Sequence, residues 1–200
     1  MRKIAVFGGT FNPVHNGHLH LAKNFYNIIH ADELLFIPTY IPPHKAPVEL
    51  AAARDRLEMC RLAVKGTPFG VSDMEVKRGG PSYTSDTLTA LKKIYGRDSS
   101  LYLIVGEDMF LTVDRWHKPE VIYSLATLCA APRGKGGCGK LTDYAVKLRR
   151  KGADVLIADI DYLPVSSTSV RSAVKKKENL SAYVPESVAC YILKKHLYSE

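Results

Sequence analysis

Apolar residues along this chain form short continuous runs that alternate with stripes at helical spacing. Six runs predict β-strands, at residues 4–7, 34–38, 69–76, 101–105, 127–131 and 155–160. Between them, apolar side chains recur three or four positions apart, which predicts helices at 16–30, 49–65, 85–95 and about 142–151. Two further helices, at 169–177 and 185–197, are expected to end the chain.

This alternation over almost the whole length predicts an α/β fold with a doubly wound parallel sheet of about five to six strands. The run 101–105 is nearly all apolar, as expected of a strand buried on both faces. We expect one domain spanning residues 1–200, with helices on both faces of the sheet and helices at the C-terminus. Ligands of such sheets bind beyond the carboxyl ends of the strands. The candidate segments are therefore 8–18, 39–45, 73–84, 106–108, 132–140 and 161–171.

Composition is that of an ordinary globular chain, with 46% hydrophobic and 24% charged residues and a formal net charge of +8. That charge fits either a nucleic-acid surface or an enzyme acting on small anions, and the lysine run 175–177 is typical of a solvated helix face. No apolar stretch approaches the roughly 20 residues that span a bilayer. The four scattered cysteines suggest neither a zinc site nor a disulfide framework. We expect a cytoplasmic protein with no membrane partner.

The segment GGTFNPVHNGHL, residues 8–19, follows the first predicted strand and carries the clearest chemistry. Gly8 and Gly9 would let the backbone turn and approach a ligand without a Cβ in the way. A helix is expected to begin within the segment, and its free N–H groups and positive dipole end would bind an anion. His15 and His18 lie three positions apart at that helix start, so both could reach one bound phosphate and stabilise charge developing on it.

Two other interpretations of these histidines are weaker. A histidine near a helix start is often only a cap or a surface residue. A metal site would need His20 as a third ligand, but His20 lies about 200° around the helix from His18. Acidic and cysteine ligands are also lacking nearby, so we assign no metal ligands and favour phosphate chemistry.

The same segment resembles the HxGH signature of the nucleotidyltransferase superfamily, with residues 15–18 as the HxGH itself. Members of that superfamily are Rossmann-like and transfer a nucleotidyl group from a nucleoside triphosphate to a phosphate or related acceptor. One branch, the bacterial nicotinate-nucleotide adenylyltransferases, is similar in further segments that occur in the same order. They are PPHK (42–45), DMEVKRGGPSYTSDTL (73–88), VGEDMFLTVDRW (105–116), VSSTSVR (165–171) and YVPESVACYI (183–192).

HxGH alone indicates only the superfamily, whereas SYTSDTL, PPHK and Trp116 indicate the branch. The resemblance implies that ATP donates its adenylyl group to nicotinate mononucleotide, with Mg²⁺ bound to the triphosphate. The products would be nicotinate adenine dinucleotide and pyrophosphate, in NAD biosynthesis. His15 and His18 would be the catalytic residues. The implied ATP-binding residues are Gly8, Gly9, Thr10, Phe11, Gly17, Gly106, Asp108, Ser167, Thr168 and Arg171.

Within that set, Asp108 would accept from ribose hydroxyls, and residues 167–171 would bind the leaving pyrophosphate. On the acceptor side, Trp116 would stack on the pyridine ring, although a tryptophan of this kind could also belong to the core. Tyr83 and Thr84 precede a predicted helix whose N–H groups could bind the ring carboxylate, and Lys45 would supply positive charge. The chain departs from the family pattern twice: Glu107 stands where relatives often have a small residue, and Asn12 where many have aspartate.

A second motif, GKGGCGK at 134–140, matches the start of a Walker A sequence, but Leu141 stands where that motif needs serine or threonine. A mobile basic loop is therefore the favoured interpretation of residues 133–140. The nearer rival function is another transfer of the superfamily, such as pantetheine-phosphate adenylylation or cytidylylation of an alcohol phosphate. The remoter one is a nucleic-acid-binding module, which leaves the HxGH turn unexplained. No nucleic-acid partner is expected, and the oligomeric state stays open.

Overall fold

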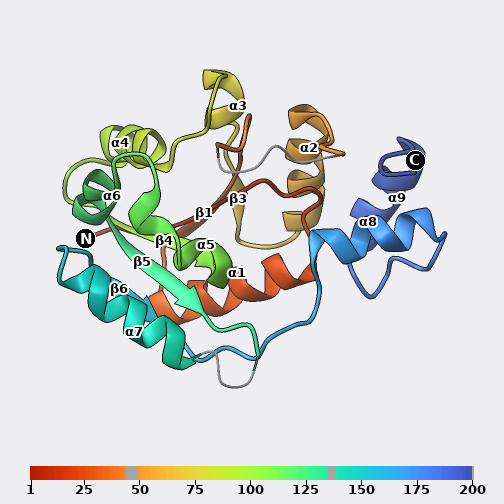
Figure 1. The fold of residues 1–200 in the computed structure, drawn as a ribbon. Coiled ribbons are helices and arrows are strands. Elements are labelled where there is room, and N and C mark those ends of the chain that lie inside the picture. Colours follow the sequence, from red (N-terminus) through yellow and green to blue (C-terminus); the bar gives the residue numbers. More distant parts are fainter. Residues whose placement is uncertain (44–48, 135–137, 200) are drawn as a thin grey trace.

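The computed structural model describes residues 1–43, 49–134 and 138–199. In this part of the chain, one sheet of six parallel strands has the order β3-β2-β1-β4-β5-β6. Its strands are β1 (Lys3–Gly9), β2 (Glu33–Pro38), β3 (Gly70–Val71), β4 (Ser100–Gly106), β5 (Ala126–Ala131) and β6 (Val155–Ile157). The structure confirms the predicted Rossmann-like, doubly wound sheet (Figure 1).

Helices cover both faces of the sheet. Successive residues of β1 point to opposite faces, so Ala5 and Phe7 enter one hydrophobic cluster while Ile4 and Val6 enter the other. The first cluster is completed by α1 (Asn16–Ile29), α2 (Ala53–Val64), α8 (Ser167–Lys175) and α9 (Glu186–Lys194). The second is completed by α4 (Thr84–Tyr95), α6 (Pro119–Leu125) and α7 (Cys138–Arg149). Among the described residues, no helix has both the length and the apolar character needed to cross a membrane.

The order of the strands determines where a ligand can bind. From β1 the chain proceeds outward through β2 to β3, and it then returns to β4 on the other side of β1. Ile4 of β1 is consequently paired with Glu33 of β2 and with Leu101 of β4. The loops that follow β1 and β4 leave the sheet toward opposite faces, which opens a crevice at their carboxyl ends.

Two predicted elements need correction. The helix expected from residue 49 begins at Ala53, because Glu49 has a φ of +66° and the N–H of Ala51 donates to Asn12 Oδ1 at 3.1 Å. The strand expected at 69–76 is limited to β3, and residues Met74–Arg78 form the short helix α3. There the buried Glu75 accepts a hydrogen bond from Thr87 Oγ1 at 2.5 Å, a tertiary contact that favours the helical turn.

The second half of the chain holds further differences, and the strand expected at 155–160 ends at Ile157. The sequence pattern did not predict α5 (Glu107–Phe110), the 3₁₀ helix η1 (Val113–Arg115) or α6. Helix α6 starts with Pro119 after Lys118 in the left-handed region, a favoured position for proline. The expectation of a loop over 133–140 is wrong for Cys138–Lys140, which form the first turn of α7. Residues 135–137 lie outside the described part.

Candidate active site

A cavity of about 500 Å³ opens at the carboxyl ends of β1, β4 and β5, in the crevice that the strand order predicts. It brings together segments that are far apart in the sequence. Tyr83 is not among the residues that line it, and Lys45 lies outside the described residues. The other predicted site residues all line it: Gly8, Gly9, Thr10, Phe11, His15, Gly17, His18, Thr84, Gly106, Asp108, Trp116, Ser167, Thr168 and Arg171.

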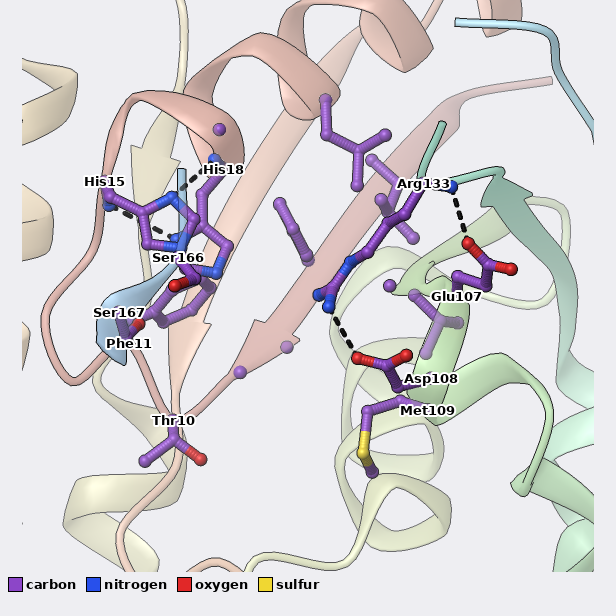
Figure 2. Close-up of a pocket in the computed structure, with 18 of the residues that line it drawn as sticks. Thr10, Phe11, His15, His18, Glu107, Asp108, Met109, Arg133, Ser166 and Ser167 are labelled. Carbon is purple, nitrogen blue, oxygen red and sulfur yellow. Dashed lines mark hydrogen bonds and ion pairs between the residues drawn. The ribbon is translucent and has the colours of Figure 1, made fainter. Parts of the chain in front are cut away.

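The two histidines form a reciprocal cap at the start of α1. The backbone N–H of His18 donates to Nδ1 of His15 at 3.3 Å, and the N–H of His15 donates to Nδ1 of His18 at 3.2 Å. Their rings stack with centroids 3.6 Å apart (Figure 2). Because both Nδ1 atoms accept, a neutral ring carries its proton on Nε2. The histidines therefore serve as caps through one nitrogen and keep the other as a donor for a ligand.

Burial keeps both rings uncharged at neutral pH. His15 is 7% exposed, and its burial, reinforced by the positive charge of Arg133, lowers its pKa to about 3. Burial, then His15 and Arg133, lower the pKa of His18 well below its usual value. His20 Nε2 lies 2.8 Å from the backbone oxygen of Asp161, and within the described residues no three histidines, cysteines or acids gather as a metal site. The pair is thus built to donate hydrogen bonds without carrying charge.

The glycines Gly8 and Gly9 do not make the turn that was predicted for them. Gly8 and Gly9 are the last residues of β1, and the turn is made by Phe11, whose φ is +46°. Their expected role in turning the chain is therefore wrong. What they provide is space: a Cβ on Gly9 would lie 3.0 Å from the Phe11 ring, and one on Gly8 would meet no atom within 4 Å. A Cβ on Gly17 would lie 3.1 Å from the ring of His15, so glycine there permits the histidine cap.

Helix α8 begins beside the same loop, as expected. Ser166 caps it by accepting from the N–H of Ser169 at 3.0 Å. Ser167 Oγ donates to the carbonyl of Pro13 at 2.9 Å, and Arg171 Nη1 donates to the carbonyl of Asn12 at 2.8 Å. A second helix N-terminus and a guanidinium are thereby held against the loop that leads to His15, which suits a site for several phosphates.

Arg133 is a site residue that the sequence did not single out. Its backbone N–H donates to Glu107 Oε2 and its Nη1 to Asp108 Oδ2, both at 2.5 Å (Figure 2). The side chain thus crosses between the end of β4 and the histidine pair. The available signal was its position directly after a buried strand, within the candidate segment 132–140. The carboxylate of Glu107 fixes the backbone of that segment.

Another end of the cavity is bordered by α4 and by the residue after η1. Helix α4 begins at Thr84, one residue before the expected start at 85, and its N-cap residue is Tyr83. Tyr83 stacks on His117, with ring centroids 4.2 Å apart, and so lies beside the cavity rather than in its lining. Trp116 lines the cavity and donates from Nε1 to Thr112 Oγ1 at 3.2 Å, while also packing against the second hydrophobic cluster. Its packing supports the core interpretation, and stacking on a pyridine ring stays a prediction.

A last contact, between Asn12 and the C-terminal segment, could not be anticipated from local sequence. Asn12 Oδ1 accepts from Tyr198 Oη at 2.8 Å, although 186 positions separate them. Asn12 Nδ2 donates to the carbonyl of Glu49 at 2.9 Å. The side chain at position 12 thus ties the loop after β1 to two distant segments.

Comparison with known proteins identifies the family. Residues 6–173 match the family model described as Cytidylyltransferase-like. A relative from Dehalococcoides mccartyi (strain ATCC BAA-2266 / KCTC 15142 / 195) is 40% identical, covering 98% of this chain and 97% of its own. A relative from Bacillus pumilus (strain SAFR-032) is 36% identical, covering 99% of both chains. Each bears the name "Probable nicotinate-nucleotide adenylyltransferase".

Solved structures show the same fold. The Plasmodium falciparum nicotinic acid mononucleotide adenylyltransferase complexed with NaAD superimposes with a TM-score of 0.80 at 18% identity, covering 99% of this chain and 98% of that one. The same enzyme complexed with APC gives 0.77 at 17% identity, with the same coverage. By its whole-length match to the curated relatives, this chain belongs to the nicotinate-nucleotide adenylyltransferase family of the cytidylyltransferase-like fold.

Proposed function

We propose that the chain transfers the adenylyl group of ATP to nicotinate mononucleotide, giving nicotinate adenine dinucleotide (NaAD) and pyrophosphate, a step of NAD biosynthesis. The relatives' names and the family support this reaction. The observation that carries it is the stacked pair of neutral imidazoles at the base of a cavity flanked by two helix N-termini. Donors placed in this way stabilise charge on a phosphate in transfer.

In the proposed complex, ATP occupies the half of the cavity between β1, β4 and α8. The ends of β1 and α1, with Gly8, Gly9, Thr10, Phe11 and Gly17, would bind its phosphates through backbone groups. Gly106 and Asp108 would contact the ribose. Asp108 would then either give up its hydrogen bond from Arg133 or accept from Arg133 and from the ribose hydroxyls together. Ser167, Thr168 and Arg171 at the start of α8 would hold the departing pyrophosphate.

Nicotinate mononucleotide is proposed to occupy the end formed by α4 and η1. The ring of Trp116 would stack on the pyridine, and the first N–H groups of α4, from Thr84 on, would donate to the ring carboxylate. Tyr83, whose own N–H donates to the carbonyl of Pro81 at 3.2 Å, is retained as a proposed contact at the edge of this end. Lys45, outside the described residues, is retained as a proposed contact of the acceptor nucleotide. These assignments follow from the family's pattern and from the position of each segment around the cavity.

The reaction itself needs few protein groups. An oxygen of the acceptor's 5′-phosphate would attack the α-phosphorus of ATP, and the bond to the bridging oxygen would break as pyrophosphate leaves with the electron pair. His15 and His18 would donate from Nε2 to the phosphate oxygens, and positioning supplies the rest. The site's donors are imidazoles, hydroxyls and a guanidinium, which suit phosphate oxygens. We therefore propose that Mg²⁺ arrives with ATP and neutralises part of the triphosphate's charge.

Several coarser features support the proposal. The net charge of +8 fits two anionic substrates. Both hydrophobic clusters lie on the two faces of one sheet, which supports a single domain over residues 1–200. Exposed Cys138 and Cys190 carry free thiols, which supports the expected cytoplasmic location.

The test is release of pyrophosphate from ATP with different acceptors, together with chromatographic detection of the dinucleotide. We expect NaAD only when nicotinate mononucleotide is present. A higher rate with 4′-phosphopantetheine or with an alcohol phosphate would favour the rival transfer of the superfamily. Absence of NaAD in the presence of both substrates and Mg²⁺ would overturn the proposal.

A further inference from the structure

Arg56 is a charged side chain with no exposed surface, and none of the roles proposed above uses it. It lies in the first turn of α2. Among the described residues, its side chain makes four hydrogen bonds, and all of them go to backbone carbonyls. Nε donates to Ala51 at 3.0 Å, Nη1 to Thr10 at 2.8 Å and Thr39 at 2.6 Å, and Nη2 to Tyr40 at 3.0 Å.

Such an arrangement is unusual for a core residue. A buried cation is costly unless its hydrogen bonds are satisfied. The planar fork of arginine holds its donors in fixed directions, so the four carbonyls must keep fixed relative positions. These carbonyls belong to three segments that follow β1, follow β2 and precede α2, and none of them lies within a strand or helix.

Two of these segments, those after β1 and β2, border the cavity side by side. Thr10 and Thr39 both line it, and the N–H of Thr39 donates to the carbonyl of Gly9 at 3.0 Å. The N–H of Tyr40 donates to Ser82 Oγ at 2.8 Å, directly before the start of α4. Contacts therefore run without a break from the ATP side through Arg56 to the acceptor side.

We infer that Arg56 is a positioning residue that sets the register between the two substrate half-sites. The inference rests on the proposed function, because it takes the loop after β1 as the ATP side and the start of α4 as the acceptor side. Arg56 touches neither substrate. It fixes the distance between the acceptor phosphate and the α-phosphorus, where a misplacement of about 1 Å can cost about a hundredfold in rate.

The experiment compares wild type with Arg56→Lys, which keeps the charge but lacks the fork, and with Arg56→Gln, which removes the charge. Titration calorimetry gives the Kd for ATP and for NaAD, and the fluorescence of the single tryptophan gives the Kd for nicotinate mononucleotide. Each substrate alone should bind within about threefold of wild type, because each contacts one half-site. NaAD spans both halves, so its Kd should rise at least about tenfold, and kcat should fall at least tenfold.

Arg61→Lys is the matched control, because it makes the same exchange on the same helix. Arg61 is half exposed and lies 3.6 Å and 3.7 Å from the carboxylates of Glu58 and Asp73. All four constants should stay at wild-type values there. Circular dichroism at 15 °C gives the folded fraction by which each kcat is corrected.

The outcomes separate the alternatives. Wild-type values of the Kd for NaAD and of the corrected kcat would overturn the inference. So would a rise in the Kd for NaAD no larger than the rise in the Kd for ATP or for nicotinate mononucleotide alone. Loss of fold in both Arg56 variants would also overturn it, because the residue would then serve the fold as a whole. A wild-type protein that makes no NaAD would instead overturn the proposed function.

Discussion

Asparagine and glutamine at position 18 separate the two functions that one imidazole combines. His18 Nδ1 accepts the N–H of His15 and completes the cap of α1, while Nε2 remains for the substrate. Asparagine places its Oδ1 close to the position of Nδ1, whereas glutamine places its amide nitrogen close to that of Nε2. His18→Asn should therefore keep the cap and lose the donor, and His18→Gln should do the reverse.

His18→Asn should lower catalysis more than stability, and His18→Gln should lower stability more than catalysis. Loss of one preorganised donor lowers kcat by about 10²–10³-fold, which is the expected effect of His18→Asn. Loss of a helix cap costs about 0.5–2 kcal/mol of the free energy of unfolding, which is the expected effect of His18→Gln. For a chain of this size, each kcal/mol lowers Tm by roughly 2–4 °C. His18→Gln should keep kcat within about tenfold of wild type.

The assay is NaAD formation at saturating ATP and nicotinate mononucleotide, combined with thermal unfolding of each variant. His20→Gln is the control, because His20 lies on the same helix two positions after His18. Its ring contacts the backbone oxygen of Asp161 instead of taking part in the cap. Near-normal turnover of His18→Asn, or equal loss of kcat in both variants of His18, would refute this division of roles.

Three further predictions follow from the site. Because burial lowers the pKa of His15 to about 3 from 6.5, the unfolded chain binds the extra proton between these values, so stability is full above pH 6.5 and falls below it. From this residue alone, denaturant unfolding should show a loss of about 2 kcal/mol by pH 5, and a His15→Asn variant that loses as much would contradict the assignment. Arg171→Ala should mainly raise the KM for ATP, and equal losses with analogues that lack the terminal phosphates would exclude a pyrophosphate contact. Nicotinate mononucleotide should exceed its amide counterpart at least about a hundredfold in kcat/KM, because N–H donors at the start of α4 favour a carboxylate; a ratio near one would refute a carboxylate-selective pocket.

The fold could be predicted from the sequence where burial leaves a local pattern. The strand at 101–105 is nearly all apolar because helices cover both faces of the sheet, and α1 shows its buried side as a stripe. The pattern failed at the sheet's edge. Strand β3 pairs only at Gly70 and Val71, with Leu35 and Phe36, and the residues after it are turned into a helix by the distant contact of Glu75.

In the candidate site too, some residues could be predicted from a local pattern and others could not. The histidine cap depends on residues three positions apart, so the spacing of HxGH was enough to bring both rings together. Arg133 could not be identified from its own segment, because its partners at 107 and 108 meet it only through the pairing of β4 with β5. Tyr198 reaches Asn12 from the end of the chain, and no local pattern carries that information.

The two departures from the family pattern can now be understood as local exchanges with their own partners. At position 12, only an amide can donate to the carbonyl of Glu49 while accepting from Tyr198; an ionised aspartate would set a carboxylate oxygen against that carbonyl. At position 107, the carboxylate of Glu107 accepts from the N–H of Arg133, which a small side chain would leave without this partner. Both side chains thereby hold loops that border the histidine pair, Asn12 through Glu49 and Tyr198 and Glu107 through Arg133.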